Sequence, residues 1–195
     1  MDILLVVLRK AQAMAQFKST SRTKVKRSHS CAQLKTDHFS GSKNIKKMRF
    51  TEGDLCCWNI TWFGVDKNGY IFECISEVFA NVPEFVCKSQ EETEFLEEYL
   101  MEYLGIDEDD WGYPPVLSEK GLYSFGGIVE DDPESKEDFK THPYWYKKWG
   151  EAKNPLHFDQ LPKKIQKIMD SHRIDVDITK TDYLYVEDAY KRGSK

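Results

Sequence analysis

Long apolar segments are absent from this sequence, and so are the short motifs that mark common catalytic sites. A helix needs about 20 apolar residues to cross a bilayer, and no run approaches that length. The apolar start over residues 3–8 is too short for a secretory signal, and Asp2 stands where a signal peptide carries positive charge. The chain also lacks Gly-x-Ser-x-Gly, His-Glu-x-x-His, a phosphate loop and a glycine-rich dinucleotide turn. We therefore expect no membrane partner, and no enzyme class is indicated.

The sequence lacks the cysteine spacing of a metal or redox site. The chain contains Cys31, Cys56, Cys57, Cys74 and Cys87. Their number is odd, two are adjacent, and no pair has the Cys-x-x-Cys spacing of zinc and redox sites. We expect reduced thiols in a cytoplasmic protein that holds no cofactor and no metal.

The charge changes sign along the chain. Residues 1–47 contain 11 Lys and Arg and only two acids, Asp2 and Asp37, whereas residues 48–195 contain 17 basic and 31 acidic residues. The first segment also shows no periodicity and little aromatic density. These patterns predict a basic, disordered leader over residues 1–47 and a single acidic domain over residues 48–195.

Three interpretations of the leader stay open. Its basic, Ser-containing and acid-poor composition is typical of an organelle transit peptide or of a tail that contacts nucleic acid. Met48 is alternatively the authentic start, because the composition changes abruptly at this residue. In the domain, the negative charge disfavours nucleic acid and favours a basic protein partner or simply solubility.

The clearest structural signal is a β-hairpin. Two runs rich in β-branched and aromatic residues, 58–65 and 70–76, flank Asp66-Lys67-Asn68-Gly69. Asn-Gly between such runs predicts a tight turn at Asn68 and Gly69. The same four residues do not fit a calcium loop, which needs its glycine at the sixth position.

Two amphipathic helices follow the hairpin. Ser89 precedes a pattern of apolar residues spaced three and four apart, which runs to Gly105 and predicts a helix capped at both ends. A second apolar stripe predicts a helix over residues 163–172, with Asp159 as its N-cap.

Further strands complete the predicted fold. Gly121–Phe125 has the composition of a short strand, and alternating apolar residues within 174–185 predict one or two closing strands. The fold class that we expect is α+β, with an antiparallel sheet and at least two helices packed on one of its faces.

Candidate catalytic groups are scattered along the chain. The four acids over residues 107–110 are typical of a solvated loop, because metal binding needs carboxylates that converge from separate elements. An enzyme that acts on a small molecule stays an alternative, with Asp109, Asp110 or His157 in a pocket between sheet and helices. We assign no catalytic residue.

The segment over residues 142–149 concentrates aromatic side chains, since it reads His-Pro-Tyr-Trp-Tyr-Lys-Lys-Trp. Interleaved aromatics and lysines can stack nucleic acid bases, but acidic stretches flank this segment. Tyr and Trp are enriched where proteins bind one another. We therefore predict that Tyr144, Trp145 and Trp149 contact a protein partner, and packing of the segment onto the sheet is the alternative.

Several short motifs carry a resemblance to a group of known proteins. They are Trp62-Phe63-Gly64-Val65-Asp66-Lys67-Asn68-Gly69, Val82-Pro83-Glu84-Phe85-Val86, Gly121-Leu122-Tyr123-Ser124-Phe125, Pro155-Leu156 and Asp159-Gln160-Leu161-Pro162. Over about residues 50–186 the chain resembles small, uncharacterised bacterial cytoplasmic proteins, some of which resemble immunity proteins of polymorphic toxin systems. The resemblance implies no active site to carry over, and the basic leader departs from the pattern.

Charge, aromatic content and resemblance together predict a non-enzymatic protein-binding module. It would be an immunity-type inhibitor that covers a basic surface of a toxin or nuclease. The negative charge would speed the encounter, and the aromatic side chains would anchor the complex. A structural or regulatory subunit, with the aromatic segment buried in its own oligomer, is the third interpretation.

Overall fold

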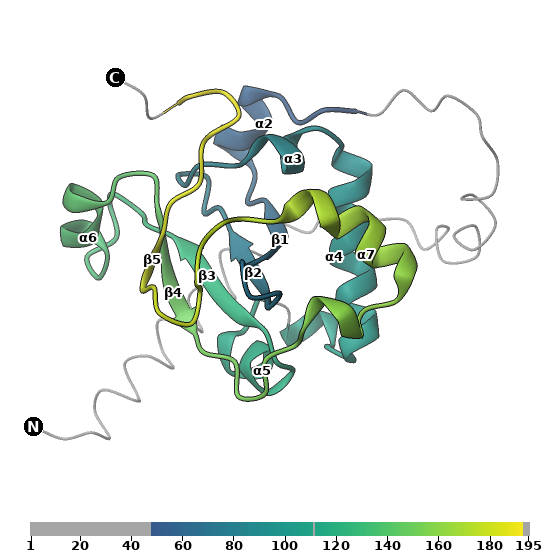
Figure 1. Cartoon of the computed structure of the whole chain (residues 1–195). Coiled ribbons are helices and arrows are strands. Elements are labelled where there is room, and N and C mark those ends of the chain that lie inside the picture. Colours follow the sequence, from purple (N-terminus) through teal and green to yellow (C-terminus); the bar gives the residue numbers. More distant parts are fainter. Residues whose placement is uncertain (1–47, 111, 193–195) are drawn as a thin grey trace, which may run out of the picture. The chain divides into compact units, whose positions relative to one another are not determined.

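The computed structural model describes residues 48–110 and 112–192 (Figure 1). The predicted leader over residues 1–47, which includes Cys31, lies outside the described residues. Within the described residues, the chain forms one five-stranded sheet with helices packed on it. The predicted α+β class is therefore confirmed.

The strands lie side by side in chain order. They are β1 (Thr61–Val65), β2 (Ile71–Ile75), β3 (Tyr123–Gly127), β4 (Tyr146–Gly150) and β5 (Tyr183–Leu184). Three neighbouring pairs are antiparallel, but β2 and β3 are parallel. The expectation of an entirely antiparallel sheet is therefore wrong at this pair. The reason is the long helical crossover over residues 76–122, which returns the chain to the end of the sheet where β2 begins.

Six α-helices and three 3-10 helices are seen among the described residues. The α-helices are α2 (Glu52–Cys57), α3 (Glu84–Cys87), α4 (Gln90–Leu104), α5 (Pro114–Glu119), α6 (Lys136–Thr141) and α7 (Lys163–Met169). The 3-10 helices are η1 (Glu108–Asp110), η2 (Phe158–Gln160) and η3 (Asp170–His172). Of the predicted closing strands, only β5 forms.

The ends of the helices test the capping predictions. At the start of α4, Ser89 Oγ accepts a hydrogen bond from the Glu92 N–H, and Gly105 ends the helix with a φ of 62°. Both predicted caps are confirmed. The predicted cap of α7 is wrong, because Asp159 lies in η2 and Pro162 directly precedes the helix. Proline suits this place because its fixed φ starts a helix and it has no N–H to leave unpaired.

The predicted hairpin forms, but its turn lies one residue earlier than predicted, with Lys67 and Asn68 as its central residues and Gly69 directly after them. Gly69 has a φ of 90°, which favours glycine, and its N–H donates to the Asp66 carbonyl oxygen. Asp66 is fully buried, and its Oδ1 accepts hydrogen bonds of 2.8 Å from the N–H groups of Asn68 and Tyr70. Its Oδ2 accepts a further hydrogen bond from the Ile178 N–H at 3.3 Å, so the side chain both holds the turn and joins it to the C-terminal part of the chain.

The two faces of the sheet belong to different hydrophobic clusters. One cluster contains Trp62, Phe72 and Phe125, and the other contains Phe63 and Ile71. The side chains alternate because successive residues of a strand point to opposite faces. We call the Phe63 side the helix face, since it packs against apolar residues of α4, α5 and α7: Leu96, Leu100, Leu117, Ile165 and Met169. The prediction of at least two helices on one face is confirmed, and Figure 1 shows α4 and α7 beside β1.

The opposite face is closed by the C-terminal segment. Asp188 Oδ2 accepts a hydrogen bond from the Val82 N–H at 3.1 Å and forms an ion pair with Arg192 at 2.7 Å. Arg192 also donates to the Leu55 and Ala80 carbonyl oxygens. This buried ion pair therefore joins the segment to the chain on both sides of the hairpin.

A buried histidine fastens η3 to the edge strand β1. His172 is buried, and its Nδ1 lies 2.9 Å from the Phe63 carbonyl oxygen. Its ring also packs on Phe85, with 4.6 Å between ring centroids. Burial lowers the pKa of His172, because the charged ring would lose its hydration. The fold therefore favours the neutral ring at this place.

Tyr146 connects β4 to the rest of the opposite face. Its hydroxyl donates to the Asn81 carbonyl oxygen at 2.6 Å and accepts from Trp62 Nε1 at 3.0 Å. The side chain is completely buried. One hydroxyl therefore satisfies polar groups of β1 and of the loop that follows β2.

Replacing Tyr146 by Phe should destabilise the fold strongly. The change leaves a buried carbonyl oxygen and a buried indole N–H without a partner, which costs about 2–4 kcal/mol of the free energy of unfolding. Urea unfolding followed by circular dichroism measures this loss. The matched control is Tyr185→Phe, because Tyr185 is 51% exposed and its hydroxyl should matter by less than about 0.5 kcal/mol. Equal stability of the two variants would contradict the prediction.

Candidate functional site

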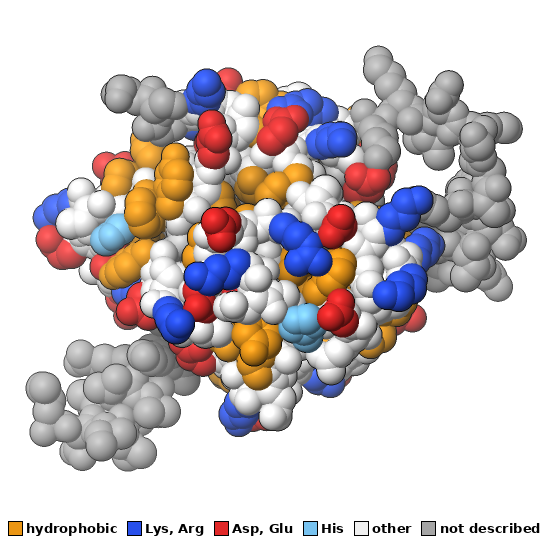
Figure 2. Space-filling view, viewed as in Figure 1, with side chains coloured by type: hydrophobic (Ala, Val, Ile, Leu, Met, Phe, Trp, Pro, Cys, Tyr) orange, Lys and Arg blue, Asp and Glu red, His pale blue; other side chains and the backbone are white. Residues whose placement is uncertain are grey.

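Four rings lie in contact at the surface, and they come from the residue after α6, the residue before β4, and β5 with the residue that follows it. His142 stacks on Tyr183 with 4.1 Å between centroids, Trp145 lies 4.9 Å from His142, and Tyr185 lies 5.2 Å from Trp145. We call these four residues the aromatic row. Figure 2 shows hydrophobic side chains gathered over β5 and beside α6. Tyr185 is 51% exposed and the other three are partly buried, so the row presents ring surface to solvent.

The aromatic row is held in place by a charged group of α6. Asp138 accepts a hydrogen bond from the Tyr183 hydroxyl at 2.7 Å and pairs with Lys147 of β4 at 2.7 Å. The two bonds lower the pKa of Asp138 and keep it ionised. A single carboxylate thus joins α6 to both strands that carry the row.

The three predicted partner-binding residues lie in different surroundings. Trp145 belongs to the aromatic row. Tyr144 has a φ of 67° and packs on Phe139 of α6, with 5.8 Å between centroids. Trp149 is 42% exposed, and its indole occupies the place where a Cβ on Gly126 of β3 would lie. The fold therefore brings only Trp145 into the row.

The geometry of β4 separates the surface residues Trp145 and Trp149 from the core residue Tyr146. Tyr146 points to the opposite face of the sheet and is buried, while its neighbour Trp145 points away from that face. A register shift at Ser124 and Phe125 leaves Trp149 as an extra residue of β4, and such bulges re-aim side chains. Sequence reasoning missed Tyr183 and Tyr185 as surface residues, although their spacing of two already placed them on one side of a strand.

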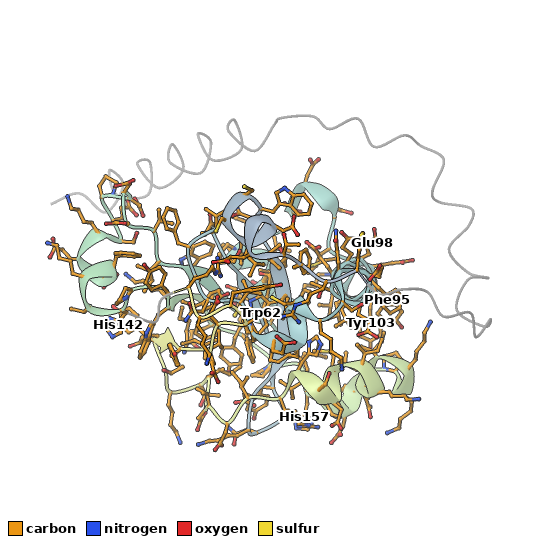
Figure 3. All side chains as sticks on the ribbon, turned by 90° about the horizontal axis from the view of Figure 1, so that it is seen from above. Trp62, Phe95, Glu98, Tyr103, His142 and His157 are labelled. Atoms are coloured by element: carbon orange, nitrogen blue, oxygen red, sulfur yellow. The ribbon has the colours of Figure 1, made fainter. Side chains whose placement is uncertain are left out.

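Asp109 and His157, two residues named for the enzymatic alternative, lie in different surroundings. Asp109 is exposed in η1, whereas both ring nitrogens of His157 engage the backbone, at Asn68 O and Asp159 N. Figure 3 shows His142 at the α6 edge and His157 well away from it. Within residues 48–110 and 112–192, no group of three or more His, Cys, Asp and Glu side chains could hold a metal ion.

The cysteines do not form a bridge among the described residues. Cys74 and Cys87 are buried, Cys56 and Cys57 are exposed in the last turn of α2, and all four are free. Burial raises the pKa of the Cys87 thiol to about 12. The two buried thiols are therefore neutral packing groups.

One buried acid was not anticipated from the sequence. Glu73 of β2 is 1% exposed and lies on the helix face, opposite Phe63 of β1 and Ser124 of β3. Neither carboxyl oxygen has a hydrogen-bond partner among the described residues, and the same holds for Ser124 Oγ. Burial, with a smaller contribution from the charge of Glu97, raises the pKa of Glu73 to about 8. At neutral pH the carboxyl group is therefore mostly protonated.

Comparison with known proteins identifies no similar protein. No protein-family model, no curated protein and no solved structure matches the chain. A search for membrane spans over the described residues finds no helix that is both long and apolar enough. The function must therefore be inferred from the side chains themselves.

Glu73 should give the fold a dependence on pH. The folded carboxyl keeps its proton up to about pH 8, whereas an unfolded chain loses it near pH 4.5. The free energy of unfolding should therefore fall as the pH rises through this window, on the order of 4 kcal/mol in total, and then level off. Glu73→Gln should lack this decline in urea unfolding between about pH 5 and pH 9.

The matched control is Glu52→Gln, since Glu52 is exposed on α2. This variant should keep the decline of the wild type. The prediction is contradicted if Glu73→Gln and Glu52→Gln lose stability equally with rising pH.

Proposed function

We propose that this protein is a non-enzymatic protein-binding module whose aromatic row docks onto a basic protein. The observation that carries the proposal is the continuous contact of Tyr183, His142, Trp145 and Tyr185 at the surface. Tyr and Trp rings provide large contact areas and lose little side-chain entropy when they bind. Residues of this kind dominate the binding energy of protein interfaces.

The charge of the domain supports a basic partner. Residues 48–195 carry 31 acids and 17 bases, and a field of this sign speeds the approach of a positively charged surface. The acids Glu134, Glu137, Asp182 and Glu187 neighbour the aromatic row in the sequence. A partner of this chemistry would be a basic toxin or nuclease, which the protein inhibits by covering its surface.

The proposed role is that of an immunity-type inhibitor acting in the cytoplasm. The resemblance to small, uncharacterised bacterial proteins, some of which resemble immunity proteins, supports this role, as do the free thiols of the four described cysteines. Inhibition of this kind needs no catalytic group in the inhibitor. It needs a rigid surface, which the bonds from Asp138 to Tyr183 and Lys147 supply.

The aromatic row should carry most of the affinity for the partner. Full-length protein is used to capture a basic partner from source cells, and the purified partner is then titrated by calorimetry. Trp145→Ala and Tyr185→Ala should each weaken binding at least about tenfold. Rising salt should slow association of the wild type, because it screens the charges that steer the encounter.

The matched control is Trp58→Ala. Trp58 is 50% exposed and follows α2, away from the aromatic row, so its removal should leave the affinity unchanged. All variants are first compared with the wild type by thermal unfolding. A partner that binds Trp145→Ala and Tyr185→Ala as tightly as Trp58→Ala would refute docking through the row.

A further inference from the structure

Two neighbouring polar side chains on the helix face have no partner among the described residues. Glu73 and Ser124 face one another in the register of β2 and β3, so their side chains point to the same face. Each residue is 1% exposed. Both carboxyl oxygens and the hydroxyl oxygen lack a hydrogen bond. Buried polar groups are nearly always paired, so two adjacent exceptions indicate a ligand that supplies the missing donors.

The pair Ile75 and Gly126, next to Glu73 and Ser124 on the same face of β2 and β3, lies closer to the surface. Gly126 follows Ser124 by two residues in β3 and therefore lies on the same face. Its register partner is Ile75, which is only partly buried. The indole of Trp149 covers Gly126 and is 42% exposed. Trp149 is thus a partly exposed side chain at the edge of this part of the helix face, and Pro114 of α5 lies near Gly150 on the same face.

Two glycines make room for the side chains that lie on this part of the face. A Cβ on Gly126 would collide with the Trp149 ring, and a Cβ on Gly150 would lie 2.6 Å from Ser124 Oγ and 3.3 Å from Pro114 Cβ. Neither glycine has a positive φ, so backbone conformation does not demand it. The close approach of Trp149 to Gly126 and of Ser124 to Gly150 explains both glycines.

The chemistry of these groups selects a cation. A carboxylate and a hydroxyl accept hydrogen bonds, and the face of an indole attracts positive charge. Glu97 adds negative potential at Glu73, which disfavours an anion. An apolar ligand would leave the three oxygens unpaired.

We propose that Trp149 covers a binding site for a guanidinium or ammonium group, which donates hydrogen bonds to the Ser124 hydroxyl and to the Glu73 carboxylate, and that Glu73 releases its proton to solvent when the cation binds. Because Glu73 is almost inaccessible, the indole must swing off Gly126 to admit the cation, and it then packs on the bound group. The site does not depend on docking through the aromatic row. A free small cation tests it without any partner, so failure of either proposal leaves the other standing.

The experiment is a titration of the full-length protein with methylguanidinium, and separately with methylammonium, at about pH 8, where a large share of the Glu73 carboxyl groups is ionised. It is followed by NMR of the tryptophan indole N–H signals. Trp149→Phe identifies the Trp149 signal. The expected result is a saturable shift of that signal, with a dissociation constant on the order of 1 mM. Methylguanidinium should bind more tightly, because its planar fork can donate two parallel bonds to one carboxylate.

Glu73→Gln should weaken binding at least about tenfold, and Ser124→Ala should weaken it about threefold. Ser124→Ala tests the proposal if Glu73→Gln fails to fold. Glu52→Gln is the matched control and should bind as the wild type does, since its carboxyl group is exposed on α2. Sodium chloride at equal ionic strength should give no saturable shift. A linear, non-saturating response, or unchanged binding by both Glu73→Gln and Ser124→Ala, overturns the proposal.

Discussion

The parallel pairing of β2 with β3 is the constraint on which the rest of this structure depends. It places both strands in the middle of the sheet, with β1 on one side and β4 and β5 on the other. Central strands are covered on both faces, as the complete burial of Phe72 and Phe125 on one face and Ile71 on the other shows. The same pairing sets Glu73 beside Ser124, so a polar pair becomes buried in the centre of an otherwise apolar sheet.

Strand β4 divides one aromatic segment between the core and the surface. Tyr146 satisfies buried groups of two other segments, while Trp145 and Trp149 remain partly exposed. The division follows from the period of two in a strand, together with the bulge that re-aims Trp149. Stability and the proposed recognition of a partner therefore involve adjacent residues. A substitution at Tyr146 should affect the core, whereas one at Trp145 should affect the surface.

Local signals in the sequence predicted the local structure well. The hairpin around Asn68, within one residue of its turn, the helix from Ser89 to Gly105 and the α+β class all follow from residues that lie close together in the chain. The parallel pair could not be predicted, because it depends on where a long crossover delivers β3. The burial of Glu73 could not be predicted either, since an acid within a strand is typical of a solvated face. Glu73 is buried because α4 and α5 pack on the helix face. The aromatic row combines two segments about 40 residues apart. The sequence therefore indicated Trp145 as a surface residue, but it indicated Tyr183 and Tyr185 only as residues of a strand.

The C-terminal segment has a consequence for the order in which the protein folds. The β1–β2 hairpin contains only local contacts and can form within microseconds. The bonds from Asp188 to Val82 and from Asn81 to Val186 instead join residues more than 100 positions apart, and contacts of such separation form slowly because a long loop must close first. During synthesis, the hairpin must therefore leave the ribosome with Trp62 and Phe72 still uncovered on the opposite face. This interval, before residues 186–192 arrive to close that face, is when the chain is most exposed to aggregation.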